Sequence, residues 1–398
     1  MTTIRRAVLG GCALGLATGW NIANTGAVAG QLASAYGVGL AVVGLFTTAL
    51  FVTHVAMQIP AGKAADRFGP RRTGVLALTL LVVFNSLALA APDPRLALAA
   101  RLLAGVGTGF GFISGSAYVR SKSGLPFAQG LYGGVALGGG GLALAIVPWA
   151  EGWLGWRAPF LTAVAVAVGG LALLAAGPAD GPRQRQPRQA HVPSGVLRDV
   201  RLYRLAVLFS ASLGLSVVLG NWVVTLLQRE GGMGRGPAGT IGALTLVLGV
   251  VSRPLGGWIL HAHPRRMRAA VGASLVGGAL GTLAVAAASP PALTVAGALL
   301  IGVAAGIPFA PAFTGAARLR PDAQAAAVGL VNGAASVVIL VGTPLLGLTF
   351  SLPGGGQAGF VAAAVLWAVA LALLPSAREL AAETETTLSR SAPESRSG

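Results

Sequence analysis

Long apolar runs separated by short polar stretches make up most of this chain. The runs are about 20 residues long, the length that an α-helix needs to cross the hydrocarbon core of a membrane. A transmembrane barrel would instead alternate polar and apolar positions over segments of about 10 residues. The pattern predicts an all-α integral membrane protein with twelve transmembrane helices. They are expected at residues 8–30, 38–60, 73–92, 97–118, 127–149, 158–177, 203–227, 238–260, 269–289, 292–314, 324–349 and 358–375.

The basic residues fall mainly on one side of these predicted helices. Of the 28 Lys and Arg, 22 lie on one side, two lie within helices, and four lie on the other side, namely Arg95, Arg157, Arg229 and Arg235. Because positive residues stay in cytoplasmic loops, both termini are predicted to be cytoplasmic and the protein to reside in the cell inner (plasma) membrane. The net charge of +17 then reflects topology and contact with anionic membrane lipids, not nucleic-acid binding.

The two halves of the chain resemble each other at an offset of 194 to 200 residues. "PAGKAADRFGPRR" from Pro60 matches "PLGGWILHAHPRR" from Pro254, and "LLAGVGTG" at 102 matches "LLIGVAAG" at 299. "GLYGG" at 130 and "LALL" at 171 have counterparts at 329 and 371. Four matches in one order indicate two homologous six-helix halves, an arrangement typical of secondary transporters.

The repeat and the polar breaks divide the chain into four parts. Residues 1–177 form the first six-helix half, and the Pro-rich stretch 178–201 forms a cytoplasmic linker. Residues 202–376 form the second six-helix half, and the low-complexity stretch 377–398 is expected to be a disordered cytoplasmic tail.

Composition excludes several classes of protein. Charged residues make up 10% of the chain and hydrophobic residues 54%, unlike any soluble domain. The lone Cys12 excludes an internal disulfide and a cysteine-based metal cluster. A membrane enzyme needs acid, base or metal-binding groups that converge, and neither these nor a nucleotide-binding G-x-x-x-x-G-K-[ST] loop is evident. We therefore expect no enzymatic activity, no cofactor and no bound metal.

Several motifs together resemble the major facilitator superfamily. "GKAADRFGPRR" fits the pattern G-x-x-x-D-R-x-G-x-R-R between helices 2 and 3 of that family, and "RLLAGVGTG" is similar to its helix-4 pattern. "GGVALGGGGLALAIVP" is a loose version of the glycine-rich helix-5 pattern, and "GWRAPF" resembles the entry to helix 6. The resemblance covers residues 5 to 376 and implies twelve helices in two six-helix pseudo-repeats.

In that family the loop between helices 2 and 3 is a conformational latch. Gly62 would allow close approach, and Asp66 would accept hydrogen bonds from arginines or cap a facing helix. The alternative is a positive-inside cluster with an incidental Asp, and Leu260 replaces the acid in the second half. The predicted latch residues are Gly62, Asp66, Arg67, Gly69, Arg71 and Arg72.

The ionisable groups within the predicted helices are basic. All eleven acids fall in loops, at helix ends or in the tail, whereas Arg253, Arg101 and His54 lie within helices. An intramembrane Arg is costly and marks a function, often an anionic substrate, although Arg253 could instead be a structural or snorkelling residue. For Arg101 the family motif implies proton or conformational coupling, with interfacial snorkelling as the alternative. His54 could be a packing residue or a proton relay.

Helix 8 adds a further resemblance. "SRPLGGW" at 252–258 is similar to helix 8 of the nitrate/nitrite porter branch, in which an arginine binds the anion. The second arginine of that branch, in helix 2, is replaced here by His54 and Gln58. The predicted substrate-binding residues are Arg253, His54, Gln58, Asn21, Asn24, Tyr132, Asn221 and Asn332, each of the last five being as compatible with helix–helix hydrogen bonding.

These observations predict a monomeric secondary active transporter that works by alternating access on a small anion or organic acid. The substrate could be coupled to protons or to a counter-anion. The alternative within transport is an efflux transporter of hydrophobic drug-like compounds, and a sensor built on a transporter scaffold is a third interpretation.

Overall fold

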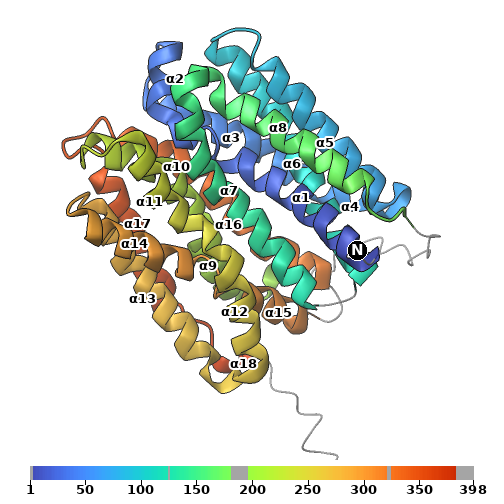
Figure 1. Ribbon diagram of the computed structural model, residues 1–398. Helices are drawn as coiled ribbons and strands as arrows, with labels where there is room; N and C mark the ends of the chain where they lie inside the picture. Colours follow the sequence, from blue (N-terminus) through green and yellow to red (C-terminus); the bar gives the residue numbers. More distant parts are fainter. Residues whose placement is uncertain (1–2, 124–125, 181–195, 321–323, 382–398) are drawn as a thin grey trace, which may run out of the picture.

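The computed structural model describes residues 3–123, 126–180, 196–320 and 324–381, and within these ranges every regular element is a helix (Figure 1). The first half contains α1 (Thr3–Ala23), η1 (Gly26–Val28), α2 (Ala29–Tyr36), α3 (Leu40–Ala56), α4 (Gln58–Phe68), α5 (Pro70–Leu87), α6 (Pro94–Ser123), α7 (Pro126–Leu154), η2 (Gly155–Arg157) and α8 (Ala158–Ala175). The second contains η3 (Val196–Arg198), α9 (Val200–Phe209), η4 (Ser210–Leu215), α10 (Ser216–Arg229), α11 (Arg235–Val247), α12 (Gly249–Ala262), η5 (Pro264–Arg266), α13 (Met267–Ala286), α14 (Pro291–Ala304), α15 (Phe309–Leu319), α16 (Gln324–Thr349), α17 (Gln357–Ala372) and α18 (Ala377–Ala381).

The helices are apolar on their outer as well as their inner faces. Large aliphatic side chains such as Val83 and Leu280 are 52% and 56% exposed on the surface of the bundle. A helix that is apolar all round suits a lipid environment, in which no polar outer face is needed. Within the described residues, seven helical stretches are long and apolar enough to cross a membrane, and Leu40–Ala56 and Gln357–Ala372 are shorter apolar helices.

Helices overlap each of the twelve predicted segments, but several segments are interrupted. The second is divided into α3 and α4, the eighth into α11 and α12, and the tenth into α14 and α15. The seventh contains the π-helical turn Ser210–Leu215 between α9 and α10. The predicted disordered tail differs at its start, because residues 377–381 form α18, while residues 382–398 lie outside the described part.

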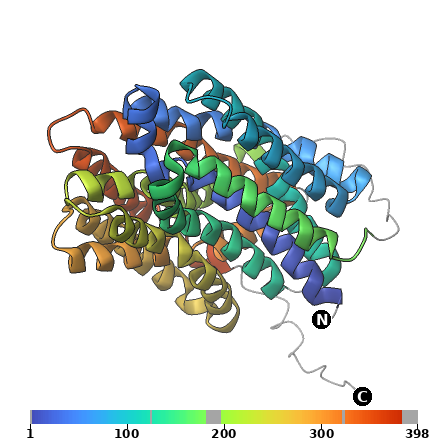
Figure 2. The same ribbon diagram turned by 45° about the horizontal axis from the view of Figure 1, so that its top comes forward.

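The two halves lie side by side, with α7 and α12 along their boundary (Figures 1 and 2). The glycines of α7 allow close backbone contact on both sides of this helix. A Cβ on Gly139 would meet the backbone of Leu16 in α1, and a Cβ on Gly134 would lie 3.0 Å from Val250 Cα in α12. The glycine-rich run thus packs α7 against its own half and against the other half at once.

One end of the bundle, which we call the closed end, has an apolar core shared by both halves. It includes Trp20 and Phe46 from the first half and Trp222 and Phe350 from the second. Hydrogen bonds also join the halves there: Thr47 Oγ1 donates to Asn221 Oδ1 at 3.3 Å, and Thr48 Oγ1 donates to Leu340 O at 2.9 Å.

The other end carries the arginines of residues 67–72, 198–204 and 265–268, and we call it the basic end. Its larger apolar clusters each belong to one half: one contains Leu14, Leu78 and Leu174, and another contains Phe209 and Leu380. The described halves therefore share a core at the closed end and have separate cores at the basic end.

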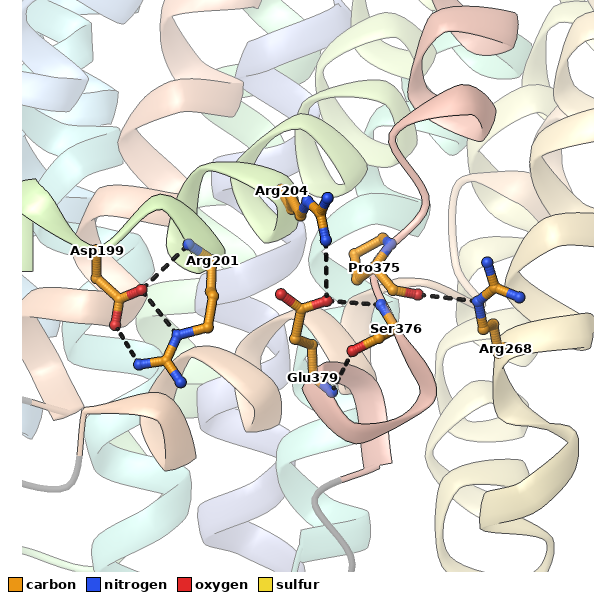
Figure 3. A network of polar contacts seen from close by, with 7 residues as sticks. All are labelled: Asp199, Arg201, Arg204, Arg268, Pro375, Ser376 and Glu379. Atoms are coloured by element: carbon orange, nitrogen blue, oxygen red, sulfur yellow. Dashed lines mark hydrogen bonds and ion pairs between the residues drawn. The ribbon is translucent and has the colours of Figure 1, made fainter.

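Hydrogen bonds and an ion pair join the segment after α17 to the basic end of the second half (Figure 3). Ser376 N donates to Glu379 Oε2 at 2.6 Å and Ser376 Oγ accepts from Glu379 N at 3.3 Å, a reciprocal capping box. Glu379 also lies 3.7 Å from Arg204 Nη1 of α9, and Arg268 of α13 donates to Pro375 O at 3.2 Å. These contacts, together with Leu380, which is fully buried in the apolar core of the second half, hold α18 in place.

Candidate functional site

A cavity lies between the two halves, and in this conformation it has a volume of about 50 Å³ open to water-sized molecules. Both halves contribute to its walls. The lining residues are Thr18, Gly19, Ile22, Phe51, His54, Phe112, Ala136, Leu137 and Gly140 from the first half, and Phe209, Leu213, Val217, Leu246, Arg253, Phe309, Asn332, Ser336 and Ile339 from the second.

The helix interruptions lie beside this cavity. His54 is in the last turn of α3, and Phe309 begins α15 just after the break in the tenth segment. The π-helical turn carries Leu213, and Arg253 follows the break between α11 and α12 by one turn. Within a membrane, non-helical backbone must face a cavity or protein, and interrupted helices are therefore common beside ligand sites.

Arg253 is the charged group of the cavity. Its side chain is 3% exposed, and its Nη1 donates to Gly133 O of α7, in the other half, at 2.7 Å. Its guanidinium carbon lies 4.3 Å from the centre of the Phe309 ring, a cation–π contact. Its Nε is buried and has no hydrogen-bond partner among the described residues. Leaving a buried donor without a partner is costly.

No carboxylate lies among the described residues that line the cavity. The described acids that form ion pairs do so elsewhere: Glu151 with Arg235 of α11, Asp199 with Arg201, and Glu379 with Arg204. The charge of Arg253 is therefore uncompensated within the cavity. A site of this kind attracts an anion and repels a cation.

Apart from Arg253, four polar residues line the same space, namely Thr18, His54, Asn332 and Ser336. His54 Nδ1 is hydrogen-bonded to Thr108 Oγ1 at 3.0 Å, which fixes the imidazole ring, and the ring lines the cavity. Asn332 and Ser336, one turn apart on α16, line the opposite half, and Ser336 Oγ donates to Asn332 O at 3.0 Å. These groups offer hydrogen bonds to a ligand without adding charge.

The other predicted substrate-binding residues do not line the cavity, because their polar groups bond to nearby backbone or side chains. Gln58 Nε2 donates to His54 O at 3.1 Å, and Tyr132 OH donates to Phe112 O at 2.6 Å. Asn24 Nδ2 donates to Pro159 O at 2.8 Å. Asn221 Nδ2 donates to Val217 O at 2.9 Å, while Asn21 accepts from Asn85 Nδ2 at 2.8 Å. For these five residues the structure shows helix–helix and local bonding.

Arg101 also lies away from the cavity lining, inside the first half. It is 1% exposed, and its Nη2 donates to Asn21 O at 2.5 Å while its Nε donates to Phe46 O at 3.4 Å. These bonds join α6 to α1 and α3. Snorkelling to an interface does not describe a side chain this deeply buried.

The loop between α4 and α5 contacts a residue that the sequence had not suggested, Asp180. The Asp180 carboxylate accepts from the backbone N–H of Arg71 at 3.0 Å and of Arg72 at 3.3 Å, so it caps the first turn of α5. Arg71 Nε in turn donates to Leu174 O at 3.1 Å, at the end of α8. Gly69 adopts a φ of +96° beside this carboxylate.

Gly62 makes no close approach in this conformation: a Cβ at this position would meet no atom within 4 Å, whereas a Cβ at Gly69 would meet the Asp180 carboxylate. The role of Gly62 in the latch stays a prediction. Arg67 lies exposed over the Phe68 ring at 5.2 Å. The side chain of Asp66 lies outside the described part of the structure. In the second half, Leu260 packs against an apolar core, as its side chain dictates.

The aromatic residues of the cavity were not recognised from the sequence. Phe51, Phe112, Phe209 and Phe309 come from four helices, and in an apolar chain each is indistinguishable from a lipid-facing or packing residue. The stretch "GIPFAPAF" at 306–313 did carry a signal, because two prolines interrupt the tenth apolar segment. Within the described residues no three His, Cys, Asp or Glu gather as a metal site.

Comparison with known proteins agrees with this architecture. The sequence matches the Major Facilitator Superfamily over residues 9–318. Over 94% of this chain and 100% of its own, the human organic anion transporter MFSD10 (TETRAN) superposes with a TM-score of 0.68 at 18% identity. A crystal structure of the nucleoside transporter NupG (D323A mutant) gives a TM-score of 0.73 at 14% identity, over 93% of this chain and 98% of that one. At such identities these structures show the fold.

Curated relatives match parts of the chain. The gentisate transporter of Corynebacterium glutamicum is 27% identical over 54% of this chain and 52% of its own length. The probable sulfoacetate transporter SauU of Cupriavidus necator is 27% identical over 60% and 61%. The cyanate transport protein CynX of Escherichia coli is 29% identical over 32% and 34%. The matched region thus spans from about one third to three fifths of these relatives. The family match over most of the chain, the all-helical fold and the apolar helices together place this multi-pass membrane protein in the Major Facilitator Superfamily, a family of transporters rather than enzymes.

Proposed function

We propose that this protein is a secondary transporter of a small organic anion, with Arg253 as the group that binds the anionic head. One observation carries the proposal: a buried arginine lines the cavity between the halves, its Nε lacks a partner among the described residues, and no described carboxylate lines the same space. Burying a guanidinium is costly, and a substrate anion would offset that cost.

The names of the curated relatives support the same class of substrate. Gentisate, sulfoacetate and cyanate, named for the three relatives, are all anions. They differ in size and shape but share a negative charge. A common need for one cationic group in the cavity is therefore consistent with Arg253 as that group.

Alternating access is supported by the unequal ends of the bundle. The halves share an apolar core at the closed end and have separate cores at the basic end. A rocking motion would exchange these two arrangements around the cavity. If the basic end faces the cytoplasm, as the positive-inside rule predicts, this conformation presents the cavity inward.

Arg253 is also placed to couple binding to that motion. Its Nη1 bonds to Gly133 O of the other half, so the same guanidinium that binds the anion holds α12 to α7. The contact of Asp180 with the first turn of α5 would be part of the latch at the basic end, together with the predicted latch residues. Arg101, which joins α1, α3 and α6, would keep the first half rigid while it moves.

Ligand-induced stabilisation of purified protein tests the proposal. Unfolding temperature is measured with acetate, benzoate and sulfoacetate, with benzamide as a neutral compound and tetraphenylphosphonium as a lipophilic cation. Arg253→Gln is compared with Arg157→Gln, which removes an exposed arginine stacked on Trp156 outside the cavity. We expect at least one anion to stabilise wild type and Arg157→Gln but not Arg253→Gln. Uptake of that anion into proteoliposomes, present in wild type and absent in Arg253→Gln, then tests transport.

The mainly apolar cavity lining favours one alternative, an efflux transporter of hydrophobic compounds. If only tetraphenylphosphonium or benzamide raises the unfolding temperature, and does so equally in Arg253→Gln and Arg157→Gln, this result would support that alternative and contradict the anion proposal. Stabilisation by an anion without any flux would indicate a sensor. We further propose a monomer in the plasma membrane with both termini cytoplasmic, which labelling of introduced cysteines from each side would test.

A further inference from the structure

We propose that the anion is a planar aromatic monocarboxylate whose ring is held between two aromatic walls, one from each half, with Phe309 as the residue that selects for the ring. This inference rests on the proposed anion site at Arg253 and adds the chemical class of the ligand.

The first wall belongs to the first half of the chain. Phe51 and His54 of α3 have ring centroids 5.2 Å apart, and His54 and Phe112 of α6 have centroids 6.3 Å apart. All three side chains line the cavity. These separations are typical of aromatic clusters, whose rings present faces and edges to a further ring.

The second wall belongs to the second half of the chain. Phe209 and Phe309 have centroids 5.9 Å apart and both line the cavity. Phe313, one turn after Phe309 on α15, stacks on Phe309 at 4.8 Å and contacts Phe209 at 4.8 Å. The ring of Phe309 is thereby held by two further rings. Because the cavity lies between the two halves, a flat ring bound there would contact aromatic groups on both sides.

Arg253 gives this space one anionic position. The Phe309 ring covers one face of the guanidinium at 4.3 Å, and Nη1 is bonded to Gly133 O. Nε lies on the edge that a carboxylate bridges with two parallel hydrogen bonds, and it has no partner among the described residues. A carboxylate bound in the plane of this edge would direct the attached ring toward the edge of Phe309, because the guanidinium and the stacked Phe313 ring cover the faces of Phe309.

The charges of the cavity limit the ligand to one negative group. Among its described lining residues Arg253 is the one with a permanent charge, so a second carboxylate would be buried without a cationic partner. Hydroxyl substituents on the ring would find His54, Asn332 or Ser336. These limits favour a benzoate-like acid, with or without hydroxyl groups.

The test compares four probes that separate the contribution of the negative charge from that of the planar ring. Dissociation constants are measured by isothermal titration calorimetry at pH 7 for benzoate, cyclohexanecarboxylate, acetate and benzamide. Benzoate and cyclohexanecarboxylate share the charge but differ in planarity, and benzamide shares the ring but lacks the charge. We expect benzoate to bind at least about five-fold more tightly than cyclohexanecarboxylate, which is the order expected for an aromatic pair. Acetate and benzamide should bind more weakly than benzoate.

Phe309→Leu should reduce the ratio of the benzoate and cyclohexanecarboxylate constants to near one. Phe84→Leu is the matched control, because Phe84 packs in a core of the first half away from the cavity, and it should leave the ratio unchanged. Should Phe309→Leu not fold, Phe209→Leu removes a ring from the same wall and should lower the ratio likewise. The ratio of the two dissociation constants reports on recognition of the ring alone, because a displaced Arg253 would weaken the binding of benzoate and of cyclohexanecarboxylate equally.

The outcomes separate the two proposals. Equal binding of benzoate and cyclohexanecarboxylate to wild type, both lost in Arg253→Gln, would overturn the aromatic inference and leave the anion site standing. Binding of acetate without benzoate would overturn it too. If Arg253→Gln binds every probe as wild type does, the proposed function itself fails. A ratio that falls in Phe309→Leu and not in Phe84→Leu supports the inference.

Discussion

Replacing Gly26 with Ala tests whether the closed end opens during transport. Gly26 is in η1 of the first half and packs directly on Asn221 of α10 in the second half. A Cβ at this position would lie 2.6 Å from Asn221 Cα and 2.7 Å from Asn221 O. Because both atoms belong to the backbone of a helix, they cannot rotate away as a side chain would.

The size of the effect follows from this overlap. Carbon atoms in contact are separated by about 3.5–4.0 Å, so η1 and α10 must move apart by about 1 Å. Overpacking of this kind costs about 1–3 kcal/mol. The cost applies to the conformation in which the closed end is sealed and is relieved when the halves separate there. The equilibrium should therefore shift toward the open form by about 5- to 150-fold.

A distance measurement across the closed end would detect the shift. Ser34 and Ser351 are exposed at this end, one in each half, and would be replaced by Cys for spin labelling, with Cys12 replaced by Ser. Gly26→Ala should lengthen the label-to-label distance in a larger fraction of molecules. Gly30→Ala is the control, since a Cβ at Gly30 would meet no atom within 4 Å. A folded Gly26→Ala protein with an unchanged distance distribution, or an equal change in Gly30→Ala, would refute the reasoning.

Three further predictions concern stability at the basic end. Gly69→Ala should destabilise the protein by about 1–3 kcal/mol in thermal unfolding, because φ is +96° at this position and the new Cβ would meet the Asp180 carboxylate. Gly169→Ala on α8 is the control, since a Cβ there meets no atom within 4 Å, and it should be neutral or stabilising. Equal melting temperatures of the two variants would contradict this prediction. Arg201 lowers the pKa of Asp199 through a side-chain hydrogen bond, so the small stabilisation from this partly exposed pair is present above the ordinary pKa of the carboxyl and is lost as pH falls through the lowered value. Asp199→Asn should remove that dependence in unfolding curves recorded from pH 6 down to pH 3, and an unaltered pH slope would count against it. Glu379→Gln removes the carboxylate charge that caps α18 and contacts Arg204. We expect the variant to be cleaved faster by protease in the segment after α17, and cleavage at the wild-type rate would contradict this prediction.

The sequence by itself determined the class of this protein, an all-helical membrane protein. Runs of about 20 apolar residues must form helices within a membrane, because every backbone N–H and C=O has to find its hydrogen-bond partner inside the same segment. The internal repeat indicated two halves, and the "GKAADRFGPRR" and "RLLAGVGTG" motifs indicated the family. Arg253 and His54 stood out because polar groups are costly in such a setting. Their place in the cavity lining agrees with that argument, and their role in binding stays a prediction.

Only the tertiary structure decided which polar and aromatic side chains face the cavity. In a helix that is apolar all round, periodicity does not reveal the inner face, so Gln58 and Asn221 were as plausible as Asn332. The fold brings Gln58 and Asn221 next to backbone and side-chain partners that occupy their amides, and it leaves Asn332 at the cavity.

The same limit applies to contacts between distant segments. Asp180 meets the first turn of α5 across 109 residues of sequence, and Phe309 covers the guanidinium of Arg253 from another helix. Neither pair has a local signal, since their proximity depends on how whole helices pack. The local hydrophobic pattern of the chain determines where the helices form, and the packing of the helices determines which residues line the cavity.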